Sequence, residues 1–152
     1  VFYDDLKTIS FFGELKADLS KNISAGINGT FSSFTQKHSN EVLNLPAIRF
    51  GANVDFTITE KWYGGTNLFF VGERKDNKYV PDFLNGSLFY TTETVTLDSY
   101  FDVNAHVGYK YNERLTLFLK GNNLFNQSYE RWLNYPAQQI QVVLGANYKF
   151  DF

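Results

Sequence analysis

The chain has 152 residues, with 14 Lys and Arg against 16 Asp and Glu and a formal net charge of −2. This balance argues against a nucleic-acid binder, which needs a basic stripe. With no Cys and only two His, the chain offers no disulfide framework, no thiolate nucleophile and no His-rich metal site. Aromatic residues are 18% of the chain, yet the mean hydropathy is −0.30 and no apolar run approaches the ~18 residues of a membrane helix. Alternating strands with one lipid-facing side produce this combination.

The first half of the chain predicts four strands, because apolar side chains recur at every second position and so share one face. We expect these strands at about residues 7–19, 23–35, 47–58 and 62–73. The alternation is cleanest in the third strand, whose apolar face is Ile48, Phe50, Ala52, Val54, Phe56 and Ile58. It is weaker in the fourth strand, where one possible lipid face is Tyr63, Gly65, Phe69 and Val71.

The second half predicts a long segment and three more strands. The segment covers about residues 74–97, and residues 87–96 within it could form a strand above the membrane. A fifth strand is expected at about residues 100–111, a sixth from Leu115, and a seventh from about Gln141 to Phe152. The last run is longer than the ~5–6 residues of a globular strand. It fits the about 9–11 residues of a transmembrane β-strand.

The connections alternate between short and long. Short turns are expected at residues 20–22, 59–61 and 112–114, and outer-membrane barrels place such turns in the periplasm and their longer loops outside. By the same alternation, the first predicted strand begins at the extracellular side, where Val1 is expected. Single-chain bacterial barrels have an even number of strands, and an open sheet edge is not tolerated in lipid. Seven strands therefore predict the last third of a larger barrel, and a chain that begins at Val1 implies a removed signal or a longer polypeptide.

The C-terminal third carries a family resemblance. An alternating strand runs into Asn123-Leu124-Phe125-Asn126, followed by Tyr129, a loop with Tyr135-Pro136 and a final strand that closes on Phe. This arrangement resembles the C-terminus of TonB-dependent outer-membrane receptors. The Gly-Arg that often follows the Tyr-Pro in the family is replaced by Ala137-Gln138-Gln139. The last aromatic residues also resemble the C-terminal signal of outer-membrane barrels in general; these are Tyr148, Phe150 and Phe152.

The resemblance implies an all-β, antiparallel transmembrane barrel of the 22-strand type, of which residues 1–152 would be about the last seven strands. It implies an outer-membrane receptor of a Gram-negative bacterium for TonB-dependent uptake of a scarce nutrient, such as a ferric siderophore, haem or cobalamin. The expected partners are outer-membrane lipid, the N-terminal barrel and plug portion of the same receptor, and the barrel assembly machinery. TonB itself would be reached only through the plug domain, which is not in these residues. No cofactor, metal or nucleic acid is implied.

Candidate site residues fall into three groups. The loop aromatics could line an extracellular ligand site or pack on one another; they are Tyr79, Phe83, Phe89, Tyr90, Trp132 and Tyr135. Trp62 and Tyr111 lie at predicted periplasmic strand ends, where an aromatic girdle sits. Polar residues are expected on the lumen face, where they would meet a plug or only pair across strands; they are Glu14, Lys16, Arg49, Asp55, Asp102, His106 and Lys120.

An enzyme is not predicted. His106 shares a strand face with Asp102 and Asn104, which is compatible with acid–base or metal chemistry. However, no Ser/His/Asp spacing, paired catalytic carboxylates or metal-ligand triplet accompanies it.

Two other architectures fit part of the pattern. One is a self-contained small outer-membrane barrel with a structural or adhesive role, whose eighth strand lies within residues 74–97. The other is a soluble β-barrel that binds a ligand, with its apolar faces pointing inward.

Overall fold

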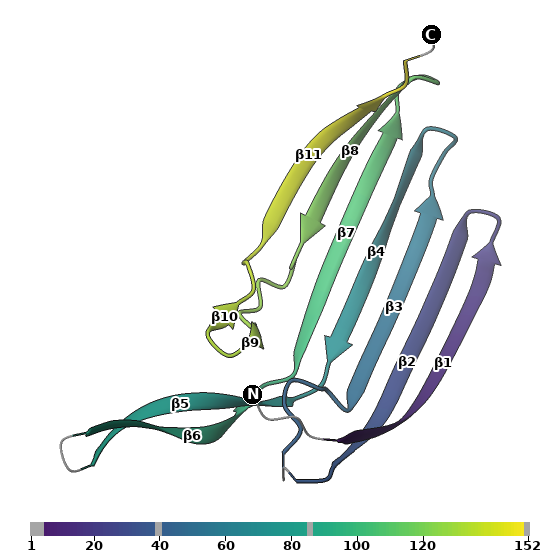
Figure 1. Ribbon diagram of the computed structural model, residues 1–152. Helices are drawn as coiled ribbons and strands as arrows, with labels where there is room; N and C mark the ends of the chain where they lie inside the picture. The colour runs from purple at the N-terminus through teal and green to yellow at the C-terminus, as the bar shows by residue number, and fades with distance from the viewer. Residues whose placement is uncertain (1–4, 39–40, 85–86, 151–152) are drawn as a thin grey trace.

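The computed structural model describes residues 5–38, 41–84 and 87–150, and every regular element in those ranges is a β-strand. Seven strands form one antiparallel sheet (Figure 1). In spatial order they are β1 (Leu6–Ser20), β2 (Ile23–Gln36), β3 (Ile48–Thr57), β4 (Trp62–Val71), β7 (Tyr100–Lys110), β8 (Leu115–Asn122) and β11 (Gln141–Tyr148). Two small hairpins lie outside this sheet, β5 (Arg74–Leu84) with β6 (Ser87–Leu97), and β9 (Glu130–Trp132) with β10 (Tyr135–Pro136). Among the described residues, no helix has the length and apolar content needed to cross a membrane.

The predicted seven-stranded architecture is confirmed. The three short turns lie at one end of the sheet, together with the C-terminal end of β11, and the three long connections lie at the other end (Figure 1). We refer to these as the periplasmic and extracellular ends. The last strand ends at Tyr148, shorter than expected, and the prediction for Phe152 lies outside the described residues.

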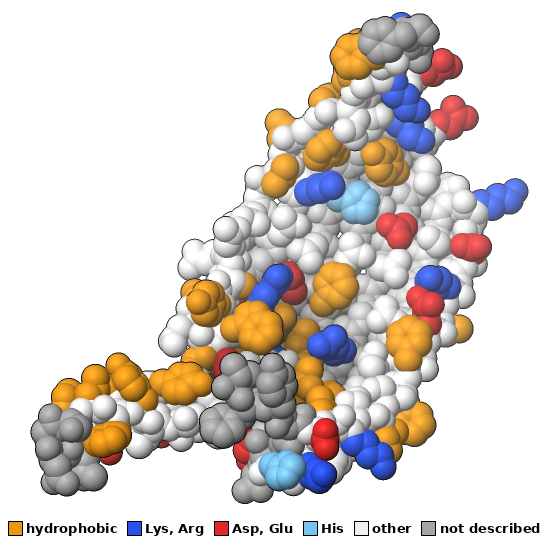
Figure 2. Space-filling model, viewed as in Figure 1, with side chains coloured by type: hydrophobic (Ala, Val, Ile, Leu, Met, Phe, Trp, Pro, Cys, Tyr) orange, Lys and Arg blue, Asp and Glu red, His pale blue; other side chains and the backbone are white. Residues whose placement is uncertain are grey.

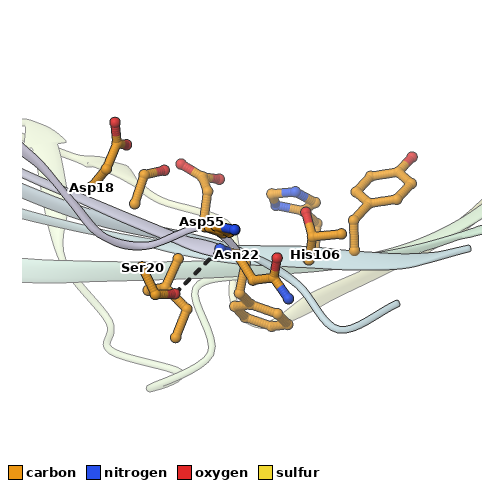
Figure 3. Close-up of a pocket in the computed structure, with 12 residues that line it drawn as sticks. Asp18, Ser20, Asn22, Asp55 and His106 are labelled. Carbon is orange, nitrogen blue, oxygen red and sulfur yellow. Dashed lines mark hydrogen bonds between the residues drawn. The ribbon is translucent and has the colours of Figure 1, made fainter. Parts of the chain in front are cut away.

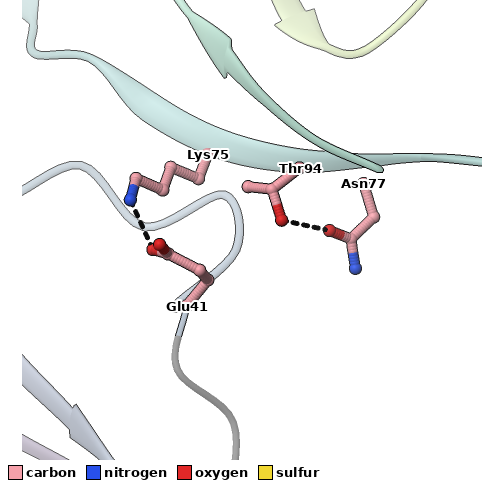
Figure 4. A network of polar contacts seen from close by, with 4 residues as sticks. All are labelled: Glu41, Lys75, Asn77 and Thr94. Atoms are coloured by element: carbon pink, nitrogen blue, oxygen red, sulfur yellow. Dashed lines mark hydrogen bonds and ion pairs between the residues drawn. The ribbon is translucent and has the colours of Figure 1, made fainter. Parts of the chain in front are cut away.

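Residues 74–97 contain two strands where one was expected. β5 pairs with β6 along its whole length, and neither strand joins the seven-stranded sheet. The hairpin projects from the extracellular end (Figure 1). Its base is tied to the β2–β3 connection by a backbone hydrogen bond from Asn44 to Lys75 (2.7 Å) and by the Lys75–Glu41 ion pair (Figure 4). The small-barrel alternative requires an eighth barrel strand in this segment. The described part of the segment contains no such strand, so that prediction is wrong there.

The strand register carries one apolar face across the sheet. Paired residues of neighbouring strands share a face, so one register row can be followed from strand to strand. One such row is Leu15, Ile27, Ala52, Leu68 and Val103. A row on the opposite face is Asp55, Gly65, His106, Lys120 and Val143. The predicted division into an apolar face and a polar face therefore holds along these rows.

β4 is the exception, because the predicted apolar set lies on the polar face. Phe69 pairs with Gly51 and Asp102, and Tyr63 pairs with Thr57 and Gly108. The apolar face of β4 is instead made by Trp62, Gly64, Thr66, Leu68 and Phe70. The sequence misled here because Phe69 and Phe70 are adjacent, so an aromatic ring stands on each face. Pairing of Phe70 with Phe50 and Phe101 decides which face is which.

No element of the described residues packs over the apolar face of the seven-stranded sheet. Leu97 and Tyr129 are the buried hydrophobic residues of the described chain, and both belong to the extracellular end. On the sheet, Phe11 is 74% exposed and Leu144 79% exposed. A soluble domain would cover such a face. A lipid bilayer covers it without further protein.

Candidate functional site

The extracellular end of β8 is organised by Asn123. This side chain is 3% exposed, and its amide group donates to the carbonyls of Gln127 and Gln138 (both 3.0 Å) and accepts from the Gln127 backbone NH (3.1 Å). Asn123 and Asn126 both have positive φ, 48° and 49°. Asn is among the few residues that tolerate this conformation. The Asn-Leu-Phe-Asn motif is therefore a turn that fixes the loop between β8 and β11, which we call the clamp loop (residues 123–140).

A second group of side chains joins the clamp loop to β7 and to the β5–β6 hairpin; we call it the rim cluster (Arg74, Tyr100, Asp102, Tyr129 and Arg131). The rings of Tyr100 and Tyr129 stack with centroids 3.8 Å apart at 5°. The Tyr129 hydroxyl donates to Asp102 Oδ2 (3.0 Å). The Arg74 guanidinium lies 5.2 Å from the centroid of the Tyr100 ring. It donates to the carbonyls of Gly72 and Glu130.

The Tyr129 hydroxyl lies between Asp102 and Arg131 in the rim cluster. Burial raises the pKa of Tyr129, and its hydrogen bond to Asp102 adds to this, while Arg131 opposes it. The same Tyr129–Arg131 contact raises the pKa of Arg131. A neutral phenol therefore links a carboxylate and a guanidinium. Because each element contributes to this one cluster, the hairpin, β7 and the clamp loop are held together at the extracellular rim.

Two cavities flank the β9–β10 hairpin. The inner cavity, about 570 Å³, is reached from the lumen face and is lined by residues that include Asp102, Asn104, Arg131 and Gln138. The outer cavity, about 730 Å³, lies against the base of β5 and is lined by Asp76, Asn77, Lys78 and Tyr79 among others. Trp132 and Tyr135 line both cavities. Asp76 Oδ2 accepts from the Leu133 backbone NH (2.9 Å), which ties the wall between the cavities to the β5–β6 hairpin.

The structure brings together three of the six predicted loop aromatics. Tyr79, Trp132 and Tyr135 surround the outer cavity, whereas Phe83, Phe89 and Tyr90 lie farther along the β5–β6 hairpin and line neither cavity. All six rings are at least 53% exposed in this chain. Figure 2 shows the same arrangement, with hydrophobic side chains gathered along the projecting hairpin and charged ones scattered over the sheet. A ligand-binding role for these rings stays a prediction.

The polar face continues to the periplasmic end, where a cavity of about 610 Å³ is lined by residues that include Asp18, Asp55 and His106. These three side chains extend to the same side of the sheet (Figure 3). Asp55 accepts from Asn53 (3.1 Å), and Glu14 pairs with Lys16 along β1 (3.0 Å). The residues predicted for the lumen therefore share one face, and two of them pair within a strand. In the described residues no set of His, Cys, Asp and Glu is close enough to hold a metal ion.

The girdle and terminal aromatics lie at the periplasmic end. The ring of Trp62 packs against Tyr109, with centroids 4.6 Å apart, and Tyr111 follows the end of β7 with 60% of its surface exposed. Tyr148 packs edge-on against Phe150 (4.8 Å). These rings lie where a membrane interface would meet the sheet, while a role of Tyr148 and Phe150 in assembly stays a prediction.

Sequence reasoning missed the rim cluster. Asp102 was placed on the lumen face, but Arg74, Tyr129 and Arg131 were not singled out as site residues. Tyr129 meets Asp102 across 27 positions of sequence, and Asp76 meets Leu133 across 57. The available signal was the chemistry of an Arg and a Tyr at the borders of predicted strands, which is too common to identify partners.

Comparisons with known proteins agree with this geometry. No protein-family profile matches the chain. The vitamin B12 transporter BtuB of Vibrio cholerae serotype O1 is 31% identical over 81 residues, which are 53% of this chain and 12% of that protein. The chain therefore spans about an eighth of the length of this relative.

Solved structures share the fold. The ferripyoverdine receptor of the outer membrane of Pseudomonas aeruginosa superposes with a TM-score of 0.78 over 97% of this chain and 20% of that chain, at 14% identity. The closed form of the ferric-catecholate import receptor Fiu from Escherichia coli K12 superposes with a TM-score of 0.75 over 97% of this chain and 22% of that chain, at 18% identity. The siderophore receptor PirA from Acinetobacter baumannii superposes with a TM-score of 0.74 over 93% of this chain and 22% of that chain, at 18% identity.

The chain has the fold of a segment of a TonB-dependent receptor barrel of the Gram-negative outer membrane. The resemblance stated from the sequence, the antiparallel barrel architecture and the outer-membrane location are thereby confirmed. The soluble-barrel alternative is wrong. The chain corresponds to about one fifth of the receptors whose structures it resembles.

Proposed function

We propose that this chain is the part of an outer-membrane receptor that closes the barrel and forms part of its extracellular ligand site, for TonB-dependent uptake of a scarce nutrient. The nutrient class is a bulky chelate such as a ferric siderophore, haem or cobalamin. The relatives and structural neighbours named above are receptors or transporters for ligands of this kind, which supports the proposal.

The observation that carries the proposal is the pair of cavities divided by Trp132 and Tyr135. Ligand sites are typically concave, with aromatic walls and a few placed polar groups. Here two exposed aromatic side chains stand between a lumen-side cavity with Asp102 and Arg131 and an outer cavity with Lys78 and Tyr79. The rim cluster and the Leu133–Asp76 hydrogen bond tie that wall to β7 and to the β5–β6 hairpin. Such a wall suits a ligand with a flat apolar part and polar groups at its edge.

The further partners follow from the same proposal. A plug domain would fill the lumen and face the polar side chains of β1, β3 and β7, and TonB would act through that plug. The proposal assigns no catalytic step to the chain. The self-contained small barrel is disfavoured because β5 and β6 pair with each other and not with the main sheet.

The test is ligand binding by the intact receptor that contains these residues. Ferripyoverdine, a ferric catecholate, haem and vitamin B12 would be titrated calorimetrically against the wild type and against Trp132→Ala and Tyr135→Ala. Loss of a central aromatic anchor is expected to weaken binding by about 2 kcal/mol, roughly thirtyfold. Phe83→Ala is the matched control, because this exposed ring lies on the same hairpin as Tyr79 and lines neither cavity.

Two outcomes would contradict the proposal. One is that none of the four chelates binds the wild-type receptor. The other is that Trp132→Ala, Tyr135→Ala and Phe83→Ala all bind the retained chelate as the wild type does, since the shared wall would then not contact it.

A further inference from the structure

Carboxamide side chains are the commonest polar groups around the two cavities beside Trp132 and Tyr135. The inner cavity is lined by five of them: Asn104, Asn122, Asn123, Gln138 and Gln141. The outer cavity is lined by three more: Asn44, Asn77 and Asn134. A carboxamide donates through its nitrogen and accepts through its oxygen, and it carries no charge. It therefore pairs best with another neutral group that both donates and accepts, such as a carboxamide or a hydroxyl.

Four of the inner carboxamides keep hydrogen-bonding capacity for a ligand. Asn123 is engaged within the clamp loop, but Asn104 uses only its oxygen, which accepts from the Asn123 backbone NH (3.2 Å). Within the described residues, the Asn104 nitrogen and both side-chain polar atoms of Asn122 have no hydrogen-bond partner. Gln141 donates to the Gln138 side-chain oxygen, which leaves the Gln138 nitrogen and the Gln141 oxygen for a ligand. These atoms offer both donors and acceptors to the inner cavity.

The charges that line the inner cavity balance and are already engaged. Its carboxylate and its guanidinium, Asp102 and Arg131, both contact the Tyr129 hydroxyl, which donates to Asp102 Oδ2 at 3.0 Å. An anionic group in this cavity would lie beside a carboxylate and would meet no cation without a partner among the described lining residues. Removing such a group from water without a matching cation is costly.

The outer cavity has the same balance of charge. Both oxygens of the Asp76 carboxylate accept backbone NH groups, from Asn77 (2.8 Å) and Leu133 (2.9 Å). Lys78, the cation of this lining in the described residues, lies directly opposite Glu93 in the β5–β6 register. Neither cavity thus has the excess of positive charge that attracts and holds an anion.

We propose that the two cavities take a neutral ligand with an apolar face on Trp132 and Tyr135 and an edge of carboxamide or hydroxyl groups. This ligand chemistry rests on the proposed function, because it describes the same site. A neutral edge pairs with the free donors and acceptors of Asn104, Gln138 and Gln141. A carboxylate edge offers acceptors alone, lies beside Asp102 and leaves the Gln141 oxygen without a donor. The site therefore selects against a ligand of the same shape with an anionic edge.

The test measures which edge chemistry is bound by the intact receptor that contains these residues. Vitamin B12, which has no net charge and an edge of carboxamides, is titrated calorimetrically beside a hydrolysed form in which one carboxamide is a carboxylate. Haem, a flat macrocycle with propionates, is the second anionic probe, and maltohexaose is the neutral probe with hydroxyls. A neutral probe should bind at least about tenfold more tightly than both anionic probes. Its Kd should change by less than about twofold between roughly 50 and roughly 500 mM salt, because no ion pair forms.

Isosteric variants test the carboxamides themselves. Asn104→Asp and Gln138→Glu keep the oxygen that accepts within the protein and replace the free nitrogen by a second carboxylate oxygen, so each should weaken the neutral probe roughly tenfold. Gln138→Lys supplies a free cation and should make haem binding tighter and dependent on salt. Asn147→Asp is the matched control, because it adds the same charge to the polar face at the periplasmic end of β11 and should leave binding unchanged. Folding of each variant is checked by the heat-dependent gel shift of barrels.

Equal or tighter binding of haem or of the hydrolysed vitamin would overturn the proposal, as would unchanged neutral binding by both Asn104→Asp and Gln138→Glu. If Trp132→Ala weakens that anionic binding, the proposed function stands and only the neutral edge falls. Binding of maltohexaose alone would support the neutral edge and contradict the chelate class of the proposed function. If no probe binds, and neither ferripyoverdine nor a ferric catecholate does, the proposed function fails together with the neutral edge.

Discussion

Replacement of Asn123 should open the clamp loop. The side chain makes three hydrogen bonds in a nearly fully buried position, to two carbonyls and one backbone NH. Each hydrogen bond contributes about 1 kcal/mol net, so Asn123→Gly should lower the free energy of opening the clamp loop by about 3 kcal/mol. Glycine keeps the positive φ and loses only the side-chain amide. Asn123→Ala should cost about 1 kcal/mol more, because alanine also pays for the left-handed conformation.

The opening is measured by hydrogen exchange. The amides of Leu124, Asn126 and Ala137 are hydrogen-bonded at 2.8 Å and should exchange about a hundredfold faster in Asn123→Gly, since 1.4 kcal/mol corresponds to a tenfold change. The amides of β7 are the internal control and should be unaffected. A change of less than about threefold in the clamp loop would refute the assignment of this stability to the Asn123 side chain.

Three further predictions concern the membrane face and the rim cluster. Val54→Arg should destabilise the barrel by about 2–4 kcal/mol in urea titrations in lipid vesicles, whereas Asn53→Arg on the polar face should cost under about 1 kcal/mol; equal costs would contradict the facial assignment. Burial and the Asp102 bond raise the pKa of Tyr129 above 10.0, so its contribution to stability is complete below pH 10.0 and is lost as the pH rises through the raised value. Compared with the wild type, the ultraviolet titration of Tyr129→Phe should lack one phenol that ionises above pH 10.0. If the missing phenol is instead one that ionises at pH 10.0, the raised pKa of Tyr129 is wrong. Arg74→Lys keeps the charge but loses the planar donor pair, so the β5–β6 hairpin should become more sensitive to limited proteolysis; unchanged cleavage would count against the rim cluster.

The strands of the barrel sheet could be predicted because the alternation that identifies each strand lies within that strand's own sequence. A lipid face on one side and a wet lumen on the other impose a period of two, which is visible within one strand such as β3. The prediction failed in β4, where Phe69 and Phe70 satisfy both faces equally. Only the register with β3 and β7 resolves this, and register depends on pairing between strands rather than on composition.

The site was less predictable, because its contacts are distant in sequence. Trp132, Tyr135 and Tyr79 could be singled out as exposed loop aromatics, but nothing in the sequence showed that the first two share a wall between cavities. Residues 74–97 read as one long connection with a possible strand, although β5 and β6 form a full hairpin. The Asn123 motif was identified through resemblance, and the structure supplies its physical reason in the positive φ and the three hydrogen bonds.

The central claim is that one face of the sheet meets lipid and the other meets a wet lumen. These 152 residues contain no Cys, so single cysteines can be placed at successive positions of β3 without a competing thiol in this part of the receptor, and any Cys elsewhere in the receptor is replaced by Ser. Each is labelled with a nitroxide in the intact receptor in vesicles, and its accessibility to oxygen, which concentrates in lipid, is compared with that to a water-soluble nickel complex. Labels at Phe50, Ala52 and Val54 should favour oxygen, and labels at Asn53 and Asp55 should favour the nickel complex. Loss of this alternation, or its inversion, would contradict the account.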